Sequence, residues 1–117
     1  MITLRSPSDN SIFQVAEADE KDKIFPNGMN WFNVRGFIRV NNKDGWRIPT
    51  ISEFELIYTE LYLKGLGNFQ KANYWSSEEC SATLAHYFSF ELGRSATYGK
   101  TGYMKIRLVK TMSAKVV

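Results

Sequence analysis

Residues 45–54, which read GWRIPTISEF, constrain the fold of this chain more than any other segment. Pro49 restricts the residue before it to extended conformations and cannot lie deep inside a helix. Thr50 is followed three residues later by Glu53, and this spacing is typical of a capping box at a helix start. We therefore expect an extended segment to end at Ile48 and a helix to begin directly after Thr50.

Two amphipathic helices are predicted. Residues 31–40 carry an apolar stripe that Asn30 can cap, and the stripe consists of Trp31, Val34, Phe37 and Ile38. Residues 51–64 carry a second stripe, which consists of Phe54, Ile57, Tyr58 and Leu61. This second helix is expected to end at Gly65, because glycine readily adopts the left-handed conformation that closes a helix.

Strands are predicted at residues 2–4, 12–15, 74–76, 86–92 and 103–111. In the alternating segment 86–92, Leu92 is expected on the same face as Phe88. In the segment 103–111, Met104 is expected on the core face and Arg107 on the opposite face. The pattern predicts an α+β fold in which two helices pack on a small antiparallel sheet, with the two termini on neighbouring strands.

Length and composition set further bounds. The 117 residues, 44% of them hydrophobic, are enough for a single domain covering residues 1–117 and too few for two. No apolar run approaches the roughly 20 residues that cross a bilayer, and the first residues do not read as a signal peptide. We therefore expect no membrane partner, and a location in a virion or in the cytoplasm.

Three phrases of the sequence, GWRIPT, the YWSS of residues 74–77 and the late IRLVK, resemble the bacterial Lcl C-terminal-like family. Its members read roughly G-W-R-L-P-T, then Y-W-S-S, then V-R, and the resemblance covers residues 28–110. It implies the C-type-lectin-like fold, which also includes formylglycine-generating-enzyme-like domains and the receptor-binding tip domains of some phages. Trp46 and Trp75 anchor the resemblance, and large aromatics of this kind are expected to be core pillars. Arg47 is expected to form an ion pair with Glu53 or Glu55.

Few residues could carry catalysis or bind a metal. Cys80 and His86 are the only cysteine and histidine, so we expect neither a disulfide nor a zinc site. The chain lacks the cysteine pair of the formylglycine-generating enzymes and the Glu-Pro-Asn or Gln-Pro-Asp motif of calcium-dependent lectins. Glu78 and Glu79 could bind a cation with Asn73, but a solvated turn is the preferred interpretation. We expect no enzyme activity, no cofactor and no calcium requirement.

Recognition is predicted in the loops after Gly65 and between the late strands. These loops combine Tyr, Arg and Lys with Ser, Thr and Gly, a composition typical of protein-recognition surfaces. The candidate binding residues are Phe69, Lys71, Arg94, Tyr98, Lys100 and Tyr103. In phage tropism proteins of the resembled fold, the variable receptor-contacting residues occupy the comparable late stretch. The alternative is that these loops only connect strands.

All charged side chains after Glu91 are basic, and such a stretch could attract an acidic polymer. The basic residues are spaced apart, so we interpret them as a solvated sheet face, balanced by the acidic run Glu17, Asp19, Glu20 and Asp22. No nucleic-acid partner is therefore expected.

These observations predict a non-enzymatic binding or assembly module, with a phage virion or tail as its setting. Its expected partner is a protein or a cell-surface glycan. A homo-oligomer is also considered, a trimer if the chain forms a fibre tip. The alternative is a purely structural domain of a bacterial cell-surface or fibre assembly.

Overall fold

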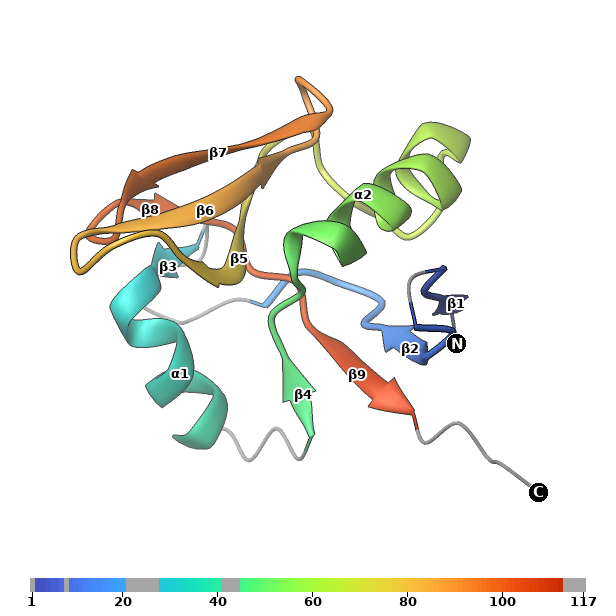
Figure 1. Cartoon of the computed structure of the whole chain (residues 1–117), viewed down its shortest axis with the longest axis horizontal. Helices are drawn as coiled ribbons and strands as arrows, with labels where there is room; N and C mark the ends of the chain where they lie inside the picture. Colours follow the sequence, from blue (N-terminus) through green and yellow to red (C-terminus); the bar gives the residue numbers. More distant parts are fainter. Residues whose placement is uncertain (1, 8, 21–27, 41–44, 113–117) are drawn as a thin grey trace.

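The computed structural model describes residues 2–7, 9–20, 28–40 and 45–112. Within them, two α-helices, α1 (Trp31–Val40) and α2 (Ile51–Glu60), accompany three small antiparallel sheets (Figure 1). A short 3-10 helix, η1 (Tyr62–Lys64), follows α2. The α+β class and the presence of both helices are confirmed, but the second α-helix ends at Glu60 and not at Gly65, and the expected single sheet is divided into three. None of the helices in this part of the chain is long and apolar enough to span a membrane.

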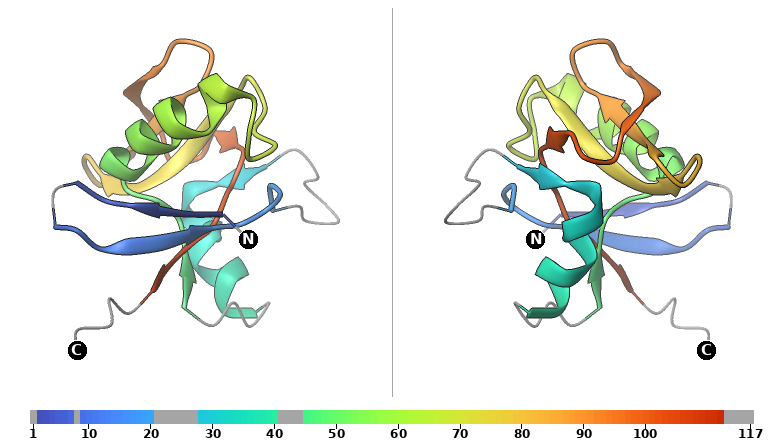
Figure 2. Two further views of the ribbon diagram at one scale, coloured as in Figure 1. Left: turned by 90° about the vertical axis from the view of Figure 1, so that its right-hand side faces the viewer. Right: turned by 90° about the vertical axis from the view of Figure 1, so that its left-hand side faces the viewer.

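The first sheet unites the early and late parts of the chain. Its strand order is β1 (Ile2–Arg5), β2 (Ile12–Val15), β9 (Val109–Met112) and β4 (Trp46–Arg47), with antiparallel neighbours throughout. Figure 2 shows β1 and β2 side by side along one side of the molecule. The first and last strands share a sheet, but β2 lies between β1 and β9. The prediction that the two termini lie on neighbouring strands is therefore wrong.

The other two sheets are built from the middle and late parts of the chain. One pairs β3 (Met29–Asn30) with β8 (Tyr103–Met104). The other has the order β5 (Asn73–Glu79), β6 (Leu84–Ser89) and β7 (Arg94–Gly99). The strand β7 therefore occupies a segment that was predicted as a recognition loop.

Two predicted strands are shorter in the structure. The strand β6 ends at Ser89, and the turn that follows leaves Leu92 62% exposed, so its predicted place on the core face is wrong. The segment 103–111 is split into β8 and β9. Lys105 lies between them and exchanges backbone hydrogen bonds with Asn73 and Trp75 of β5, which interrupts the predicted strand.

The local signals for the helix starts are confirmed. Glu53 N–H donates to Thr50 Oγ1 at 3.2 Å, and Thr50 N–H donates to Glu53 Oε1 at 2.9 Å, which completes the capping box. Asn30 Oδ1 accepts the backbone N–H of Asn33 at 3.0 Å at the start of α1. Gly65 follows η1 with φ 71°, the left-handed conformation expected of it.

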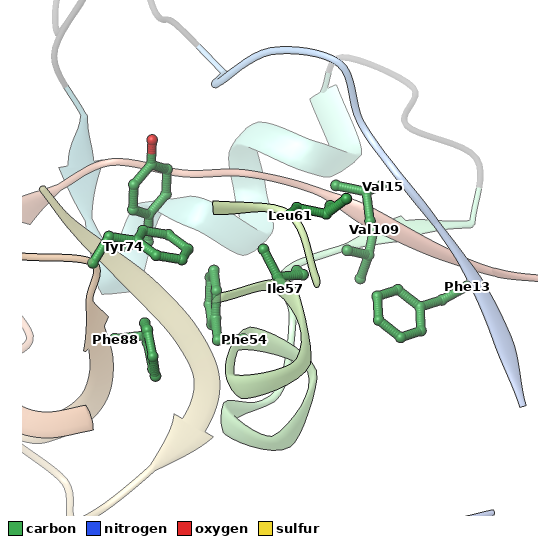
Figure 3. Close-up of a cluster of buried hydrophobic side chains, with 9 residues drawn as sticks. Phe13, Val15, Phe54, Ile57, Leu61, Tyr74, Phe88 and Val109 are labelled. Atoms are coloured by element: carbon green, nitrogen blue, oxygen red, sulfur yellow. The ribbon is translucent and has the colours of Figure 1, made fainter. Parts of the chain in front are cut away.

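One core cluster lies between α2 and the strands β2, β5, β6 and β9. Its buried members are Phe13, Val15, Phe54, Ile57, Leu61, Tyr74, Phe88, Phe90 and Val109. Figure 3 shows Phe54 beside Phe88, and their rings are stacked with centroids 5.8 Å apart. Stacked and edge-on aromatic contacts of this kind stabilise a core beyond the area that they bury.

A second cluster surrounds Trp75. Its buried members are Met29, Val34, Trp75, Ala85, Met104, Ile106 and Leu108. Trp75 is fully buried, and its indole N–H donates to the Met29 carbonyl at 3.0 Å. Trp46 is only half-buried at the margin of this cluster. The expected role as a core pillar is therefore met by Trp75 and only partly by Trp46.

We predict that Trp75→Ala lowers the free energy of unfolding by about 3 to 5 kcal/mol, because it leaves a large cavity and an unpaired Met29 carbonyl. Trp46→Ala should cost about 1 to 2 kcal/mol, since part of this side chain already contacts solvent. Urea denaturation of both variants measures the difference. Equal losses for the two variants would contradict this division of the core.

Candidate functional site

Arg107 was predicted on a solvated face, and the structure places it completely inside the protein. Its Nε donates to Asp19 Oδ1 at 3.0 Å, and its Cζ lies 3.8 Å from the centroid of the Phe69 ring. The remaining N–H groups donate to the carbonyl oxygens of Ala16, Gly67 and Asn68. The prediction failed because Arg107 lies between β8 and β9, where strand alternation does not apply.

Tyr74 completes this buried network. Its hydroxyl donates to the Asp19 carboxylate at 2.8 Å and accepts the Gln70 N–H at 3.1 Å. Burial raises the pKa of the Tyr74 phenol well above its ordinary value. The phenol therefore stays protonated at neutral pH and acts as a structural donor.

Two of the candidate binding residues are committed to the interior. Lys100 is 2% exposed, so the expectation that it faces a partner is wrong. Its ammonium group pairs with Glu79, donates to the Ala82 carbonyl at 3.1 Å and lies 4.6 Å from the centroid of the Trp31 ring. Phe69 is half-buried beneath Arg107 and packs on the rings of Tyr74 and Phe90.

The other four candidates are exposed, but the structure gathers only two of them. Tyr98 and Tyr103, which are 55% and 53% exposed, line a hollow of about 420 Å³. We call it the tyrosine hollow, and its lining residues are Ala72, Asn73, Tyr87, Tyr98, Gly102, Tyr103, Met104 and Lys105. Arg94 lies at the other end of β7, and Lys71 lies in the bend before β5; neither lines the hollow.

A larger hollow lies between α1, β4 and the start of α2, with a volume of about 740 Å³. Figure 1 shows α1 and β4 in the same part of the molecule. We call it the tryptophan groove. Its lining residues are Trp31, Phe32, Val34, Arg35, Ile38, Trp46, Arg47, Ile48, Thr50, Ser77 and Glu79. Phe32 is 54% exposed, so a large aromatic side chain meets solvent there.

Most charged groups of the groove are already paired. Arg47 forms a bidentate ion pair with Glu53, with Nη1 to Oε1 at 2.8 Å and Nη2 to Oε2 at 2.7 Å. This confirms the predicted ion pair and selects Glu53 as the partner. Glu79 pairs with Lys100, as described above. Arg35 is therefore the one charged side chain of the groove without an ion-pair partner among the described residues.

The two indole N–H groups of the residues that line the groove also differ in whether they have a hydrogen-bond partner. The Trp31 indole N–H donates to the Ser76 carbonyl at 2.9 Å. The Trp46 indole N–H has no hydrogen-bond partner within the described part of the chain. The groove thus has an apolar lining, and among the described residues neither the Arg35 guanidinium nor the Trp46 indole N–H has a partner within the chain.

The carboxylates considered for cation binding are used elsewhere. Glu78 accepts the Ile51 N–H at 2.6 Å at the start of α2, where the helix dipole favours a negative charge. Glu79 turns instead to Lys100. In the described ranges, no group of three or more His, Cys, Asp or Glu side chains could hold a metal ion.

Sequence reasoning missed the tryptophan groove because its lining comes from three separate segments. Trp31 and Trp46 were both interpreted as core residues, and each is half-buried at the groove. The available signal was Phe32, a large aromatic that lies outside the apolar stripe of the first predicted helix. Where such an exposed aromatic side chain adjoins other apolar side chains, it extends an apolar patch, and extended apolar patches mark binding surfaces.

Glu53 provides a pH-dependent test of the Arg47 ion pair. Burial opposes ionisation of Glu53, but hydrogen bonds from Arg47 and Thr50 outweigh it and hold its pKa below the ordinary value of 4.5. A carboxylate whose pKa is depressed on folding stabilises the protein above its unfolded-state pKa, and this stabilisation is lost as the pH falls toward the folded-state pKa. We predict that the Glu53→Gln variant loses less stability than the parent protein when the pH falls below about 4.5.

Urea denaturation at about pH 7, 5 and 3 provides the measurement. At neutral pH, Glu53→Gln should cost about 1 to 3 kcal/mol, because it breaks a charge-assisted hydrogen-bonded pair. Glu55→Gln is the matched control, since Glu55 is exposed on the same helix. If Glu53→Gln left the pH dependence of stability unchanged, the ion pair would not contribute as described.

No protein-family model matches this chain, and no match was found among curated proteins.

Proposed function

We propose that this chain is a non-enzymatic binding or assembly module with a C-type-lectin-like fold, and that the tryptophan groove is its binding surface. Sites of this kind are typically concave and mostly apolar, with a few placed polar groups. The observation that carries the proposal is the combination of Trp31, Trp46 and Arg35 in one groove of about 740 Å³, where Arg35 has no ion-pair partner among the described residues.

The fold assignment is supported by the way the resembling phrases meet. The GWRIPT phrase runs from β4 into α2, and the YWSS phrase lies within β5. Ser77 of the second phrase donates its backbone N–H to the carbonyl of Pro49 in the first, at 2.9 Å. Two of the three phrases that resemble the Lcl C-terminal-like family are therefore in direct contact in this chain.

The chemistry of the groove favours a protein partner over a glycan. A sugar is recognised through several free hydrogen-bonding groups, but Arg47, Glu79 and the Trp31 indole N–H already have partners within the chain. What remains is an apolar surface beside the Arg35 guanidinium, which has no ion-pair partner in the part of the chain that the structure describes. This arrangement fits a peptide segment in which an apolar side chain adjoins a carboxylate, since Arg recognises carboxylates well.

We propose a phage virion or tail as the setting, which is the one that the resemblance to receptor-binding tip domains suggests. A purely structural domain of a bacterial surface or fibre assembly is the alternative. Phe32, which is 54% exposed, adjoins the other apolar side chains that line the groove, and contiguous exposed apolar surface of this kind supports binding.

We predict that the protein binds peptides in which a Phe, Trp or Leu residue adjoins Asp or Glu. The probes are a synthetic peptide array of such pairs and the same peptides with Lys in place of the acidic residue. Arg35→Ala should weaken binding of the best peptide about tenfold, a loss of about 1.4 kcal/mol. Arg39→Ala is the matched control, because Arg39 is exposed on the same helix and does not line the groove.

Fluorescence polarisation of the labelled peptide measures these affinities. Equal losses for Arg35→Ala and Arg39→Ala would indicate a nonspecific basic surface, whose affinity would also fall steeply with salt. Binding to a glycan array without binding to any acidic peptide would overturn the choice of partner.

We also predict that EDTA changes neither the melting temperature nor peptide binding. Glu79 of the groove pairs with Lys100, and the neighbouring Glu78 accepts the Ile51 N–H, so a cation would have to compete with these contacts. Thermal melts with calcium, with magnesium and with EDTA provide the measurement. A rise in melting temperature with calcium well beyond that with magnesium would contradict the prediction.

A further inference from the structure

The strand β7 (Arg94–Gly99) is an open edge of its sheet. It pairs with β6 on one side, and the strand order ends with it. The opposite edge strand, β5, is covered, because Asn73 and Trp75 exchange backbone hydrogen bonds with Lys105. Proteins usually protect edge strands with Lys, Pro or bulges, and the six residues of β7, RSATYG, contain none of these.

The hydrogen-bond pattern shows which backbone groups are free. Lys100 N–H donates to the Thr83 carbonyl at 2.9 Å, so the pair Thr83 and Lys100 is hydrogen-bonded. Hydrogen-bonded and non-hydrogen-bonded pairs alternate along an antiparallel ladder, and Ala96 and Tyr98 therefore bond to β6. The N–H and C=O groups of Ser95 and Thr97 point to the outer edge.

Three other bonds agree with this alternation. Gly99 O, on the outer side of β7, accepts the Gly102 N–H at 2.9 Å. Leu84 O and His86 O, which oppose Gly99 and Thr97, point away from β7 and accept bonds from Cys80 N–H and from Ser76 Oγ. Within the described residues, no hydrogen bond to the outer backbone groups of Ser95 or Thr97 is present.

We propose that β7 pairs antiparallel with β7 of a second copy of this chain about a two-fold axis, which joins two three-stranded sheets into one continuous sheet. Ser95 then forms a reciprocal hydrogen-bonded pair with the partner's Thr97, and Thr97 forms one with the partner's Ser95. Such a contact is self-complementary, as a two-fold interface requires.

The side chains fit this register. Ala96 meets the partner's Ala96 on the axis, where a small side chain allows the close approach of a non-hydrogen-bonded pair. Arg94 lies opposite the partner's Tyr98, so an exposed guanidinium meets an exposed aromatic ring in a cation–π contact. Arg94 is not placed opposite itself, and no like charges face each other. The sequence of β7 thus favours a second copy over an unrelated strand, and the inference does not depend on the tryptophan groove.

The proposal is tested by measuring the oligomeric state of the parent protein and of a variant with a charge on the proposed two-fold axis. Sedimentation velocity should show a species of twice the 13.5 kDa chain mass that grows with protein concentration. Ala96→Lys places two ammonium groups on the axis and should make the protein monomeric. Ser52→Lys adds the same charge at an exposed position of α2 and should leave the dimer intact. A monomer at every concentration, or a dimer that Ala96→Lys does not weaken, would overturn the proposal.

Disulfide trapping tests the register and keeps the proposal testable if Ala96→Lys fails to fold. In a Cys80→Ser background, which removes the exposed free thiol, Ala96→Cys should give a covalent dimer on mild oxidation. The Cα atoms of residue 96 in the two copies would form a non-hydrogen-bonded pair about 4.5 Å apart, a separation that a disulfide can bridge. Thr97→Cys is the control, because it faces the partner's Ser95 and should cross-link at least tenfold more slowly. Equal cross-linking rates for the two cysteine variants would reject this register. If only Thr97→Cys formed a covalent dimer, Thr97 and not Ala96 would lie on the two-fold axis, and the proposed register would be wrong.

Discussion

The buried ion pair between Arg107 and Asp19 is the interaction on which the rest of the structure depends. A fully buried guanidinium is tolerated only when its charge and its N–H groups are all satisfied. Here Asp19 supplies the charge, and the segments around residues 16 and 67–68 supply the carbonyl oxygens. These segments are far apart in sequence. The hydrogen bonds of Arg107 therefore fix the position of the connection between β8 and β9 relative to both segments. Removing either charge would leave the other buried without a partner, which is strongly destabilising.

The strand β5 organises the core on both sides of this network. Tyr74 belongs to the cluster under α2, and Trp75 belongs to the cluster that holds α1. Successive side chains of a strand point to opposite faces, so two adjacent residues join both halves of the core. Tyr74 is also tied to Asp19 through its hydroxyl. Tyr74, Trp75 and Ser76 are therefore buried, and only Ser77 of the YWSS phrase is exposed at the tryptophan groove.

The tryptophan groove forms because α1 packs on the second core cluster with only one of its faces. Val34 is buried in the second core cluster, whereas Phe32 and Arg35 of the same helix are exposed and line the groove. Lys100 fixes the start of the helix through the Trp31 ring and also neutralises Glu79. Burying Lys100 therefore removes one candidate for recognition. Arg35 of the groove keeps no ion-pair partner within the described ranges.

The sequence by itself determined the features that depend on neighbours a few residues apart. The capping box of Thr50 and Glu53, both helices and the two early strands follow from spacing within one segment, so local rules predicted them. Of the candidate binding residues, Tyr98 and Tyr103 line the same hollow, whereas Lys100 is buried and Phe69 is half-buried against Arg107. Only the tertiary structure decided the fate of Arg107 and Lys100, the division of the sheet and the position of the groove. Each of these depends on partners from distant segments, and a linear pattern carries no information about which distant groups will meet.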